Sequence, residues 1–524
     1  MNLCLDRVRS LASGRDNLRL LEPTVGDGAF VRGLRSHPVG RQVSSVLGLE
    51  IIAEEVAKAA ESLRDSGLKG EVLEANVLEW NRSATAKFDV AVGNPPYLRF
   101  QFLSLEDRQR AISVGTSLGV ASSAVSNLWI SVLLLTLARL EPGGFFSLIV
   151  PMEFMTGVSA SRVRAWLLQE TCDVSIDLFA PGAFPAVLQE VVVLSGRRAG
   201  GRLPSSSTVN FIDHNGGTRS WKHEVSAAES TWTSYLLTAP QLSAWNHVGQ
   251  LAGIRRLGSV ARFTVSTVTG ANGFFCVSSK TAAKYELNPW TLPLLSRIRY
   301  APGLMFDGEE HKALAGTEVP AWMLSFSADA ESPSFHTGPS AYIASGEEEG
   351  LDKRYKCRIR HPWYRVPVVT PGTLMLSKRS NGFPRLVVNK AGVVTTDTVY
   401  RGVMLQGTGL VADDVAASFH NSLTILSAEV GGRSFGGGVL ELVPSEIASL
   451  FVPVSSRARR HLGELDHLSR HTSGGDDLIE RTDELLLKWI PELDEDALET
   501  IGAARRDLAL RRTSRSHGHF FGQE

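Results

Sequence analysis

The chain has 524 residues, of which 43% are apolar and 21% are charged, and its formal net charge is −1. This composition is that of an ordinary globular protein with enough core for two or three domains. The near-zero charge excludes an overall basic character, so any surface that attracts a polyanion must be local.

Residues 18–200 alternate between short apolar runs and segments of helical character. Strands are predicted at 18–23, 44–51, 87–96 and 145–151, and helices at 29–37, 53–67 and 127–144. Gly67 is expected to end the second helix, and Pro142-Gly143-Gly144 the third. Near-continuous apolar strands separated by helices indicate an α/β fold with a parallel sheet covered on both faces.

The sequence changes character after the apolar run at 191–198. Residues 199–209 are rich in Gly, Ser and Pro, which marks the end of the sheet or an exposed loop. Many short β-like runs with Gly and Pro turns follow, and then a charged helical tail. The predicted domains are therefore 1–245, 250–455, which is mostly β, and 456–524, which is helical.

The cysteines are far apart and form no CxxC pair: Cys4, Cys172, Cys276 and Cys357. This spacing argues against a disulfide framework and a structural zinc site, and no metal is expected. The N-terminus shows no signal-peptide pattern, and the longest apolar stretch, 128–140, is too short to span a bilayer. A cytoplasmic protein without membrane contact is the expectation.

A glycine turn follows the first predicted strand, with Gly26 and Gly28 between that strand and a helix. Such a turn lets a nucleotide-like ligand approach the backbone at a helix N-terminus. Position 31 is valine, so the third glycine of a dinucleotide fingerprint is absent, which argues against NAD. Glu50 ends the next strand and is placed to hold two ribose hydroxyls, although a solvent-facing strand end explains it equally well.

Polar residues also follow the other predicted strands. Glu22 lies at the end of the first strand, Asn76 at a strand edge within the segment 72–80, and Asn94-Pro95-Pro96-Tyr97 at the end of 87–96. Two consecutive prolines cannot continue a helix or a central strand, so the chain must leave the sheet there. The carboxyl edge of an open α/β sheet is where ligands bind.

The order of these motifs resembles that of the gamma-type DNA adenine-N6 methyltransferases, in the TaqI-like and Eco57I-like group of restriction-modification enzymes. The matching segments are Glu22-Pro23-x-x-Gly26-x-Gly28-x-Phe30, Gly48-Leu49-Glu50-Ile51 and Asn94-Pro95-Pro96-Tyr97. The resemblance is strong over 18–200 and looser over 250–455. It implies a Rossmann-like S-adenosylmethionine-dependent sheet, a mostly β target-recognition domain and a helical tail.

By this resemblance Asn94, Pro95, Pro96 and Tyr97 are catalytic. The amino nitrogen of adenine is a poor nucleophile because it is conjugated with the ring. The Asn94 side-chain oxygen and the Pro95 carbonyl oxygen would each accept one of its N–H bonds and direct its lone pair at the methyl carbon. Tyr97 and Phe184 would stack on the target base, which must be flipped out of the duplex.

The resemblance also implies roles toward S-adenosyl-L-methionine. The 22–30 loop would hold the methionine part through Glu22, Pro23, Thr24, Gly26, Gly28 and Phe30. Glu50 would hold the ribose, and Ile51 would pack on the adenine ring. Asn76 would meet the adenine amino group, with Val77 and Asn94 in the same site. The family usually has Asp at position 76, so weaker cofactor binding is expected.

A local basic excess occurs between Lys353 and Thr395. The window has no Asp or Glu, and its basic residues are Lys353, Arg354, Lys356, Arg358, Arg360, Arg365, Lys378, Arg379, Arg385 and Lys390. Basic residues interleaved with aromatics suit contact with nucleic acid, although a solvated basic face explains them too. Arg358, Arg360, Lys378 and Arg379 are the predicted DNA contacts, and Trp363 is more often a core residue than a contact.

Double-stranded DNA is the expected partner of a monomeric protein, with any restriction endonuclease on a separate chain. Residues 1–17 have no match to the Thr-Pro segment that closes over the cofactor in the family, so a catalytically impaired DNA-binding methyltransferase-like subunit stays open. Asn-Pro-Pro-Tyr also serves methyltransferases that act on RNA or on protein glutamine. The long region after the catalytic domain favours DNA, but a basic β-rich domain does not by itself exclude RNA.

Overall fold

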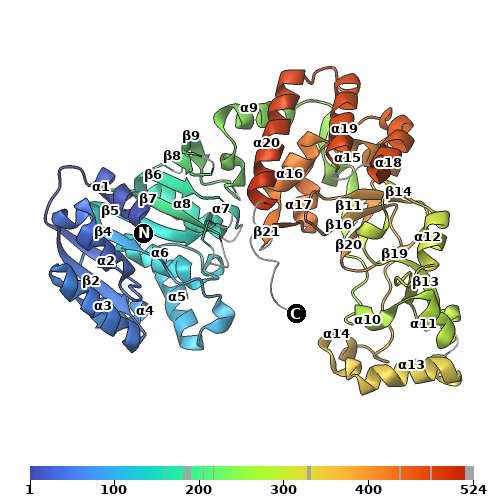
Figure 1. The fold of residues 1–524 in the computed structure, drawn as a ribbon, viewed down its shortest axis with the longest axis horizontal. Coiled ribbons are helices and arrows are strands. Elements are labelled where there is room, and N and C mark those ends of the chain that lie inside the picture. The colour runs from blue at the N-terminus through green and yellow to red at the C-terminus, as the bar shows by residue number, and fades with distance from the viewer. Residues whose placement is uncertain are drawn as a thin grey trace. The chain divides into compact units, whose positions relative to one another are not determined.

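A computed structural model describes the chain as two compact units, Met1–Ala239 and Pro240–Glu524 (Figure 1). The structure describes residues 1–157, 160–180, 183–184, 190–204, 206–215, 217–229, 231–326, 332–435, 438–471 and 475–513. Each unit has its own sheets and core. No helix in these ranges is long and apolar enough to cross a membrane.

The first unit is built on a nine-stranded sheet in the order β3-β2-β1-β4-β5-β7-β6-β8-β9. Its strands are β1 (Leu18–Glu22), β2 (Val43–Glu50), β3 (Gly70–Glu74), β4 (Phe88–Gly93), β5 (Leu140–Pro151), β6 (Thr171–Leu178), β7 (Val191–Arg198), β8 (Ser206–Asp213) and β9 (Arg219–Ser226). Strands β1 to β5 pair in parallel, whereas β7 runs antiparallel to both β5 and β6. The sheet is therefore mixed, and the purely parallel sheet predicted from the sequence is wrong beyond β5.

Helices cover this sheet. They are α1 (Asn2–Leu11), α2 (Ala29–Ser36), α3 (Ala53–Ser66), α4 (Val77–Ser83), α5 (Leu105–Ser117), α6 (Leu128–Ala138), α7 (Glu153–Thr156) and α8 (Ser161–Glu170). Leu5, Val31 and Leu63 of α1, α2 and α3 share one hydrophobic core with β1, β2, β4 and β5. This apolar face holds α1 against the strands that carry the predicted motifs at their ends.

Two sequence expectations fail at strand boundaries. The helix predicted over 127–144 ends at Ala138, and Pro142-Gly143-Gly144 lies inside β5, where the pairing with β4 skips from Leu140 to Phe145. The prolyl-glycyl run is thus an irregularity in a strand and not a helix end. Of the two alternatives for 199–209, the end of the sheet is wrong, because β8 begins at Ser206 and β8 and β9 extend the sheet, whereas residues 199–204 do form a largely exposed loop after β7.

The second unit combines small sheets with helices. Its strands are β10 (Ile254–Arg256), β11 (Ala261–Thr264), β12 (Cys276–Val277), β13 (Thr291–Leu295), β14 (Met305–Phe306), β15 (Trp322–Leu324), β16 (Leu374–Ser377), β17 (Arg379–Ser380), β18 (Leu386–Asn389), β19 (Val394–Thr395), β20 (Val399–Met404), β21 (Arg433–Phe435), β22 (Val439–Glu441) and β23 (Phe451–Pro453). They form sheets of five, four, three and two strands, the largest in the order β11-β20-β16-β18-β14.

Helices occur along the whole length of the second unit. They are α9 (Ala239–Val248), α10 (Asn272–Phe275), α11 (Ser279–Lys284), α12 (Gly308–Ala315), α13 (Thr337–Glu348), α14 (Tyr355–Arg358), α15 (Ala412–Phe419), α16 (Ser422–Gly431), α17 (Pro444–Ser449), α18 (Leu462–His471), α19 (Asp476–Trp489) and α20 (Glu495–Thr513). The last helix packs on α16, so the helical tail belongs to the same compact unit as the small sheets. The finer predicted boundary at 455/456 stays a prediction.

Candidate functional site

Four strands of the first unit end side by side at one edge of the sheet. The order β3-β2-β1-β4 makes them neighbours, and their parallel pairing points their carboxyl ends the same way. Glu22 and Glu50 end β1 and β2, whereas Asn76 and Asn94 closely follow β3 and β4. The structure therefore gathers these predicted residues at the edge where open α/β sheets bind ligands.

The glycine loop between β1 and α2 has a backbone that glycine suits. Gly26 and Gly28 have φ angles of 54° and 84°, in the left-handed region. Gly28 is also crowded, because a Cβ there would lie 2.9 Å from the Ala59 Cα in α3. Phe30 is buried in the first turn of α2. Among the described residues, no side chain caps the N-terminus of α2 with a hydrogen bond.

Contacts tie the glycine loop to the Asn-Pro-Pro-Tyr turn. The Thr24 hydroxyl donates to the carbonyl oxygen of Asn94 at 3.4 Å. Pro23 packs against Gly93, the residue before Asn94, since a Cβ on Gly93 would lie 3.3 Å from the Pro23 Cδ. The two predicted motifs are therefore parts of one continuous surface.

Glu50 holds the glycine loop through its carboxylate. Its Oε2 accepts from the Gly26 N–H at 3.0 Å, and its Oε1 accepts from the N–H groups of Ile51 and Ile52 at 2.8 and 3.0 Å. Each carboxylate oxygen can accept two hydrogen bonds, so Oε2 keeps one lone pair for a further donor. Ile51 and Ile52 are 61% and 56% exposed, which leaves an apolar surface beside that oxygen.

Glu22 is a buried carboxyl with an unused oxygen. The residue is only 2% exposed, and its Oε2 has no hydrogen-bond partner in the part of the chain that the structure describes. Burial, with a smaller contribution from Asp27, raises the pKa of Glu22 well above its ordinary value. A cationic group at this edge would satisfy the carboxylate, so the site fits a ligand with an ammonium group.

Asn76 is the N-cap of α4 and has a neighbour that the sequence did not reveal. Its Oδ1 accepts from the Leu78 N–H at 3.0 Å, and its Nδ2 donates to Asp107 Oδ1 at 2.9 Å. Asp107 belongs to α5, which is 31 positions further along the chain. A carboxylate thus lies beside position 76 although that residue is an amide. Val77, the next predicted residue, is buried at the start of α4.

The Asn-Pro-Pro-Tyr turn presents Asn94 and covers Pro95. Asn94 is exposed, Pro95 is buried, and Pro96 and Tyr97 are partly buried. The Tyr97 hydroxyl lies 2.7 Å from Asn94 Oδ1 and 3.2 Å from the Ile149 carbonyl oxygen. Burial raises the pKa of Tyr97, so the phenol is protonated and donates. Tyr97 here supports the Asn94 amide.

Phe184 lies among aromatic side chains on the other half of the edge. It is 41% exposed and meets Phe179 edge to face at 5.1 Å. Phe179 stacks on His214 at 5.6 Å. His214 Nε2 lies 2.7 Å from Asp177 Oδ1, and Arg7 of α1 donates to the same buried carboxylate from Nε at 2.9 Å. This ion cluster, which connects α1 to β6, was not predicted from the sequence.

The predicted DNA contacts of the second unit separate into two groups. Arg358 on α14 is exposed, as are the neighbouring cations Lys353, Arg354 and Lys356, and none of the four forms an ion pair with another described residue. Arg360 instead donates to the carbonyl oxygens of Val268 and Thr269, both at 2.7 Å.

The other two predicted contacts share an acidic partner. Arg379 donates to Glu441 at 2.8 Å, and Lys378 lies 3.9 Å from the same carboxylate. The local charge of these two side chains is thus partly neutralised. Trp363 is 9% exposed and packs in the core around Phe274, which confirms it as a core residue.

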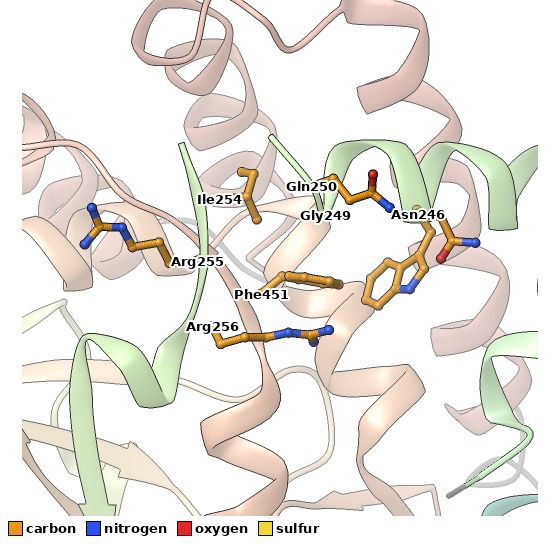
Figure 2. Close-up of a pocket in the computed structure, with 8 residues that line it drawn as sticks. Asn246, Gly249, Gln250, Ile254, Arg255, Arg256 and Phe451 are labelled. Carbon is orange, nitrogen blue, oxygen red and sulfur yellow. The ribbon is translucent and has the colours of Figure 1, made fainter. Parts of the chain in front are cut away.

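A pocket of about 290 Å³ lies in the second unit (Figure 2). Its lining residues are Trp245, Asn246, Gly249, Gln250, Ile254, Arg255, Arg256 and Phe451. The guanidinium of Arg256 lies 3.7 Å from the centre of the Phe451 ring and donates to the Ser449 carbonyl oxygen at 2.5 Å. Arg256 is therefore engaged by the protein itself, and no predicted site residue lines this pocket.

Comparisons with known proteins match both units. Residues 229–487 match the family described as Type II methyltransferase M.Eco57I, C-terminal domain, and residues 50–184 match Eco57I restriction-modification methylase. The chain is 20% identical over 509 residues to Type II methyltransferase M.AccI of Acinetobacter calcoaceticus, covering 89% of this chain and 88% of that protein. It is 23% identical over 458 residues to Type II methyltransferase M.XamI of Xanthomonas campestris pv. amaranthicola, with coverages of 84% and 82%.

A solved structure extends the comparison to the fold. The chain resembles the Type IIL restriction-modification enzyme MmeI in complex with DNA at a TM-score of 0.57 and 12% identity, over 98% of this chain and 75% of that one. The similarity confirms the predicted Rossmann-like α/β methyltransferase sheet followed by a further domain with small sheets and helices.

Proposed function

Because the chain belongs to the Eco57I-like methyltransferases of restriction-modification systems, we propose that it transfers a methyl group from S-adenosyl-L-methionine to adenine N6 of a flipped-out base in duplex DNA. The observation that carries the proposal is the single edge formed by Glu22, Glu50 and Asn94 with the glycine loop between them. The groups proposed to hold the cofactor and the groups proposed to accept hydrogen bonds from the target amine would then share one surface.

The acceptor chemistry follows from the Asn-Pro-Pro-Tyr turn. The exposed Asn94 Oδ1 and the Pro95 carbonyl oxygen would each accept one N–H of the target amine, which directs the nitrogen lone pair outward. Tyr97 keeps the Asn94 amide oriented through its 2.7 Å hydrogen bond. The protein would contribute mainly by positioning the methyl donor and the target amine, because the sulfonium provides a good leaving group.

Each cofactor role is assigned to a residue whose free polar atom or exposed apolar side chain matches one part of S-adenosyl-L-methionine. The sulfonium of S-adenosyl-L-methionine would supply the methyl group. Glu22 would pair its free oxygen with the ammonium group of the cofactor, and Glu50 Oε2 would accept from a hydroxyl of the cofactor ribose. Ile51 would pack on the adenine ring of the cofactor. Asp107 would place a carboxylate beside Asn76, whose amide stands where the family usually has Asp.

DNA binding is assigned to the unpaired cations around α14. Lys353, Arg354, Lys356 and Arg358 would neutralise phosphates, which fixes position without reading sequence. Arg360 is better placed to hold the loop at 268–269 than to contact DNA. The chain is further proposed to act as a cytoplasmic monomer, with any endonuclease as a separate partner.

Long-read sequencing of DNA from cells that express the chain tests the proposed function. The host should lack its own adenine methylation. Adenines in one recurring sequence context should be modified by the wild-type protein and unmodified with Asn94→Ala. Modification of cytosine, or no modification by wild-type protein that is present and folded, would refute the proposal.

A further inference from the structure

The segment that follows the Asn-Pro-Pro-Tyr turn carries large apolar side chains into solvent. Leu98 is 44% exposed, Phe102 is 70% exposed and Leu105 is 71% exposed. Residues 98–105, here called the apolar turn, contain the short 3-10 helix Phe100–Phe102 and lead into α5. Single exposed apolar residues are common, but three within eight positions form a patch that marks an interaction surface.

Exposed apolar side chains of the first unit concentrate at the edge of the candidate active site. Among its described residues, the large exposed ones are Met1, Ile51, Ile52, Leu98, Phe102, Leu105 and Phe184. All except Met1 follow the carboxyl ends of β2, β4 or β6. The patch is therefore continuous along the chain with the site proposed to receive the target base.

The backbone of the apolar turn is fixed although its side chains are free. The N–H of Leu128, at the start of α6, donates to the Leu98 carbonyl oxygen at 2.9 Å. Arg108 donates to the carbonyl oxygens of Leu103 and Gln101 at 3.1 and 3.2 Å. These bonds hold the turn in place without covering Phe102, so the ring is presented in advance.

The charge of the apolar turn suits a polyanion. Residues 94–104 contain one cation, Arg99, and no Asp or Glu. Arg99 is exposed and forms no ion pair with any described residue. An apolar ring beside an unpaired arginine, next to a site for an extruded base, matches the side chains that wedge between base steps in duplex DNA.

We propose that the apolar turn faces duplex DNA and that Phe102 enters the stack at the step from which the target base leaves. This inference rests on the proposed function. Removing a base from the duplex costs its stacking and pairing, and an aromatic ring in the vacated step replaces part of that stacking. Leu98 and Leu105 pack beside the opened step, and Arg99 lies against a phosphate.

Single-turnover methylation by Phe102→Ala tests the inference. Two duplexes are compared, both built on the context found by sequencing: one fully paired, and one with an abasic site opposite the target adenine, where the base is already unpaired. On the paired duplex the variant should be about tenfold slower than wild type, and on the abasic duplex it should match wild type within about twofold, because extrusion of an adenine without a pairing partner costs less and depends less on the ring.

Two further variants distinguish the loss of an inserted apolar side chain from a general loss of activity. Phe102→Leu keeps an apolar side chain and should recover most of the rate on the paired duplex. Leu510→Ala removes a side chain that is 64% exposed on α20 and should leave both rates unchanged. A Phe102→Ala protein with wild-type rates on both duplexes, or with equal losses on both, overturns the inference alone. Wild-type protein that methylates neither duplex overturns the proposed function, and this inference with it.

Discussion

The side chain of Asn94 is held by Tyr97, which lies three residues further along the chain. The Tyr97 hydroxyl lies 2.7 Å from the Asn94 side-chain oxygen, and the same hydroxyl is near the Ile149 carbonyl oxygen of β5. An amide side chain on an exposed turn can otherwise rotate, and it would then present its NH₂ to the target amine. In the proposed reaction, the hydroxyl therefore selects the amide orientation in which an acceptor faces the target base.

Tyr97→Phe removes this hydrogen bond and keeps the aromatic ring. We expect kcat for methyl transfer to fall by about 2- to 10-fold, which is the loss of one neutral hydrogen bond, and the KM for the cofactor to stay unchanged. Steady-state kinetics with duplex DNA would measure both. A faster Tyr97→Phe enzyme would instead mean that the hydroxyl competes with the substrate for Asn94.

His420 is a second residue whose setting has a measurable consequence. It is 1% exposed, and burial together with Arg385 lowers its pKa to about 3. Its Nε2 accepts from the Leu386 N–H at 3.2 Å. Below pH 6.5 the unfolded chain protonates this imidazole while the folded chain keeps it neutral. The stabilisation it provides is therefore complete above pH 6.5 and is lost as the pH falls toward 3.

Urea titrations at several pH values would detect this linkage. Relative to His420→Gln, which keeps an acceptor for the Leu386 N–H, the wild type should lose about 1.4 kcal/mol of unfolding free energy for each pH unit below 6.5. The exposed His247, replaced by Gln, is the control and should leave the wild-type slope intact. Parallel pH profiles for wild type and His420→Gln would contradict this account.

The turn from β1 into α2 has two positions that favour glycine. Gly26 and Gly28 both have positive φ, but only Gly28 is also crowded, by the backbone of α3. A side chain at either position would strain the backbone, and a side chain at Gly28 would also clash with α3. The two positions can therefore be compared as a matched pair.

Gly28→Ala should unfold at lower temperature than Gly26→Ala and should bind S-adenosyl-L-methionine more weakly. Backbone strain alone costs about 1–2 kcal/mol, so Gly26→Ala sets that baseline. The 2.9 Å contact with Ala59 Cα adds to it at Gly28 because two packed backbones must separate. Thermal unfolding and calorimetric titration would compare the two variants, and equal effects would show that α3 yields easily.

Local motifs at strand ends were predictable, whereas contacts between distant elements were not. The glycine turn and the Asn-Pro-Pro-Tyr turn are short segments next to apolar runs, so their positions follow from the sequence. Asp107 beside Asn76 and Arg7 beside Asp177 join residues 31 and 170 positions apart, and only the packing of helices on the sheet brings them together.

The error over 127–144 has the same origin. Pro142-Gly143-Gly144 has the composition of a helix end, yet it lies in β5 as an irregular segment of the pairing with β4. Arg360 lies in a run of basic residues typical of a DNA-binding surface, and the sequence did not reveal that it donates to two carbonyl oxygens about 90 positions earlier; its DNA contact stays a prediction. Tertiary partners decide the role of such residues.

The helix α20, which ends at Thr513, is an integral part of the second unit. Arg512 of α20 and Glu429 of α16 are 4% and 3% exposed in their side chains and lie 2.7 Å apart. Arg512 also donates to the carbonyl oxygens of Asn381, Gly382 and Gly438. One buried guanidinium thus connects the helical tail to two loops of the small sheets.

Arg512→Ala should destabilise the second unit by about 3–5 kcal/mol, because it leaves the Glu429 carboxylate buried without a partner. Arg506→Ala, on the exposed side of the same helix, should change the unfolding free energy by less than about 0.5 kcal/mol. Urea denaturation followed by tryptophan fluorescence would measure both. Losses of equal size would mean that α20 contributes through helix content alone.

We propose that Asn94 directs methyl transfer to the amino group of adenine. This role can be tested by mass spectrometry of nucleosides from DNA treated with the purified chain and isotope-labelled S-adenosyl-L-methionine. Labelled N6-methyladenine should form with the wild-type protein and fall to background with Asn94→Ala, while DNA binding is largely retained. Label on cytosine, or undiminished N6-methyladenine from Asn94→Ala, would contradict it.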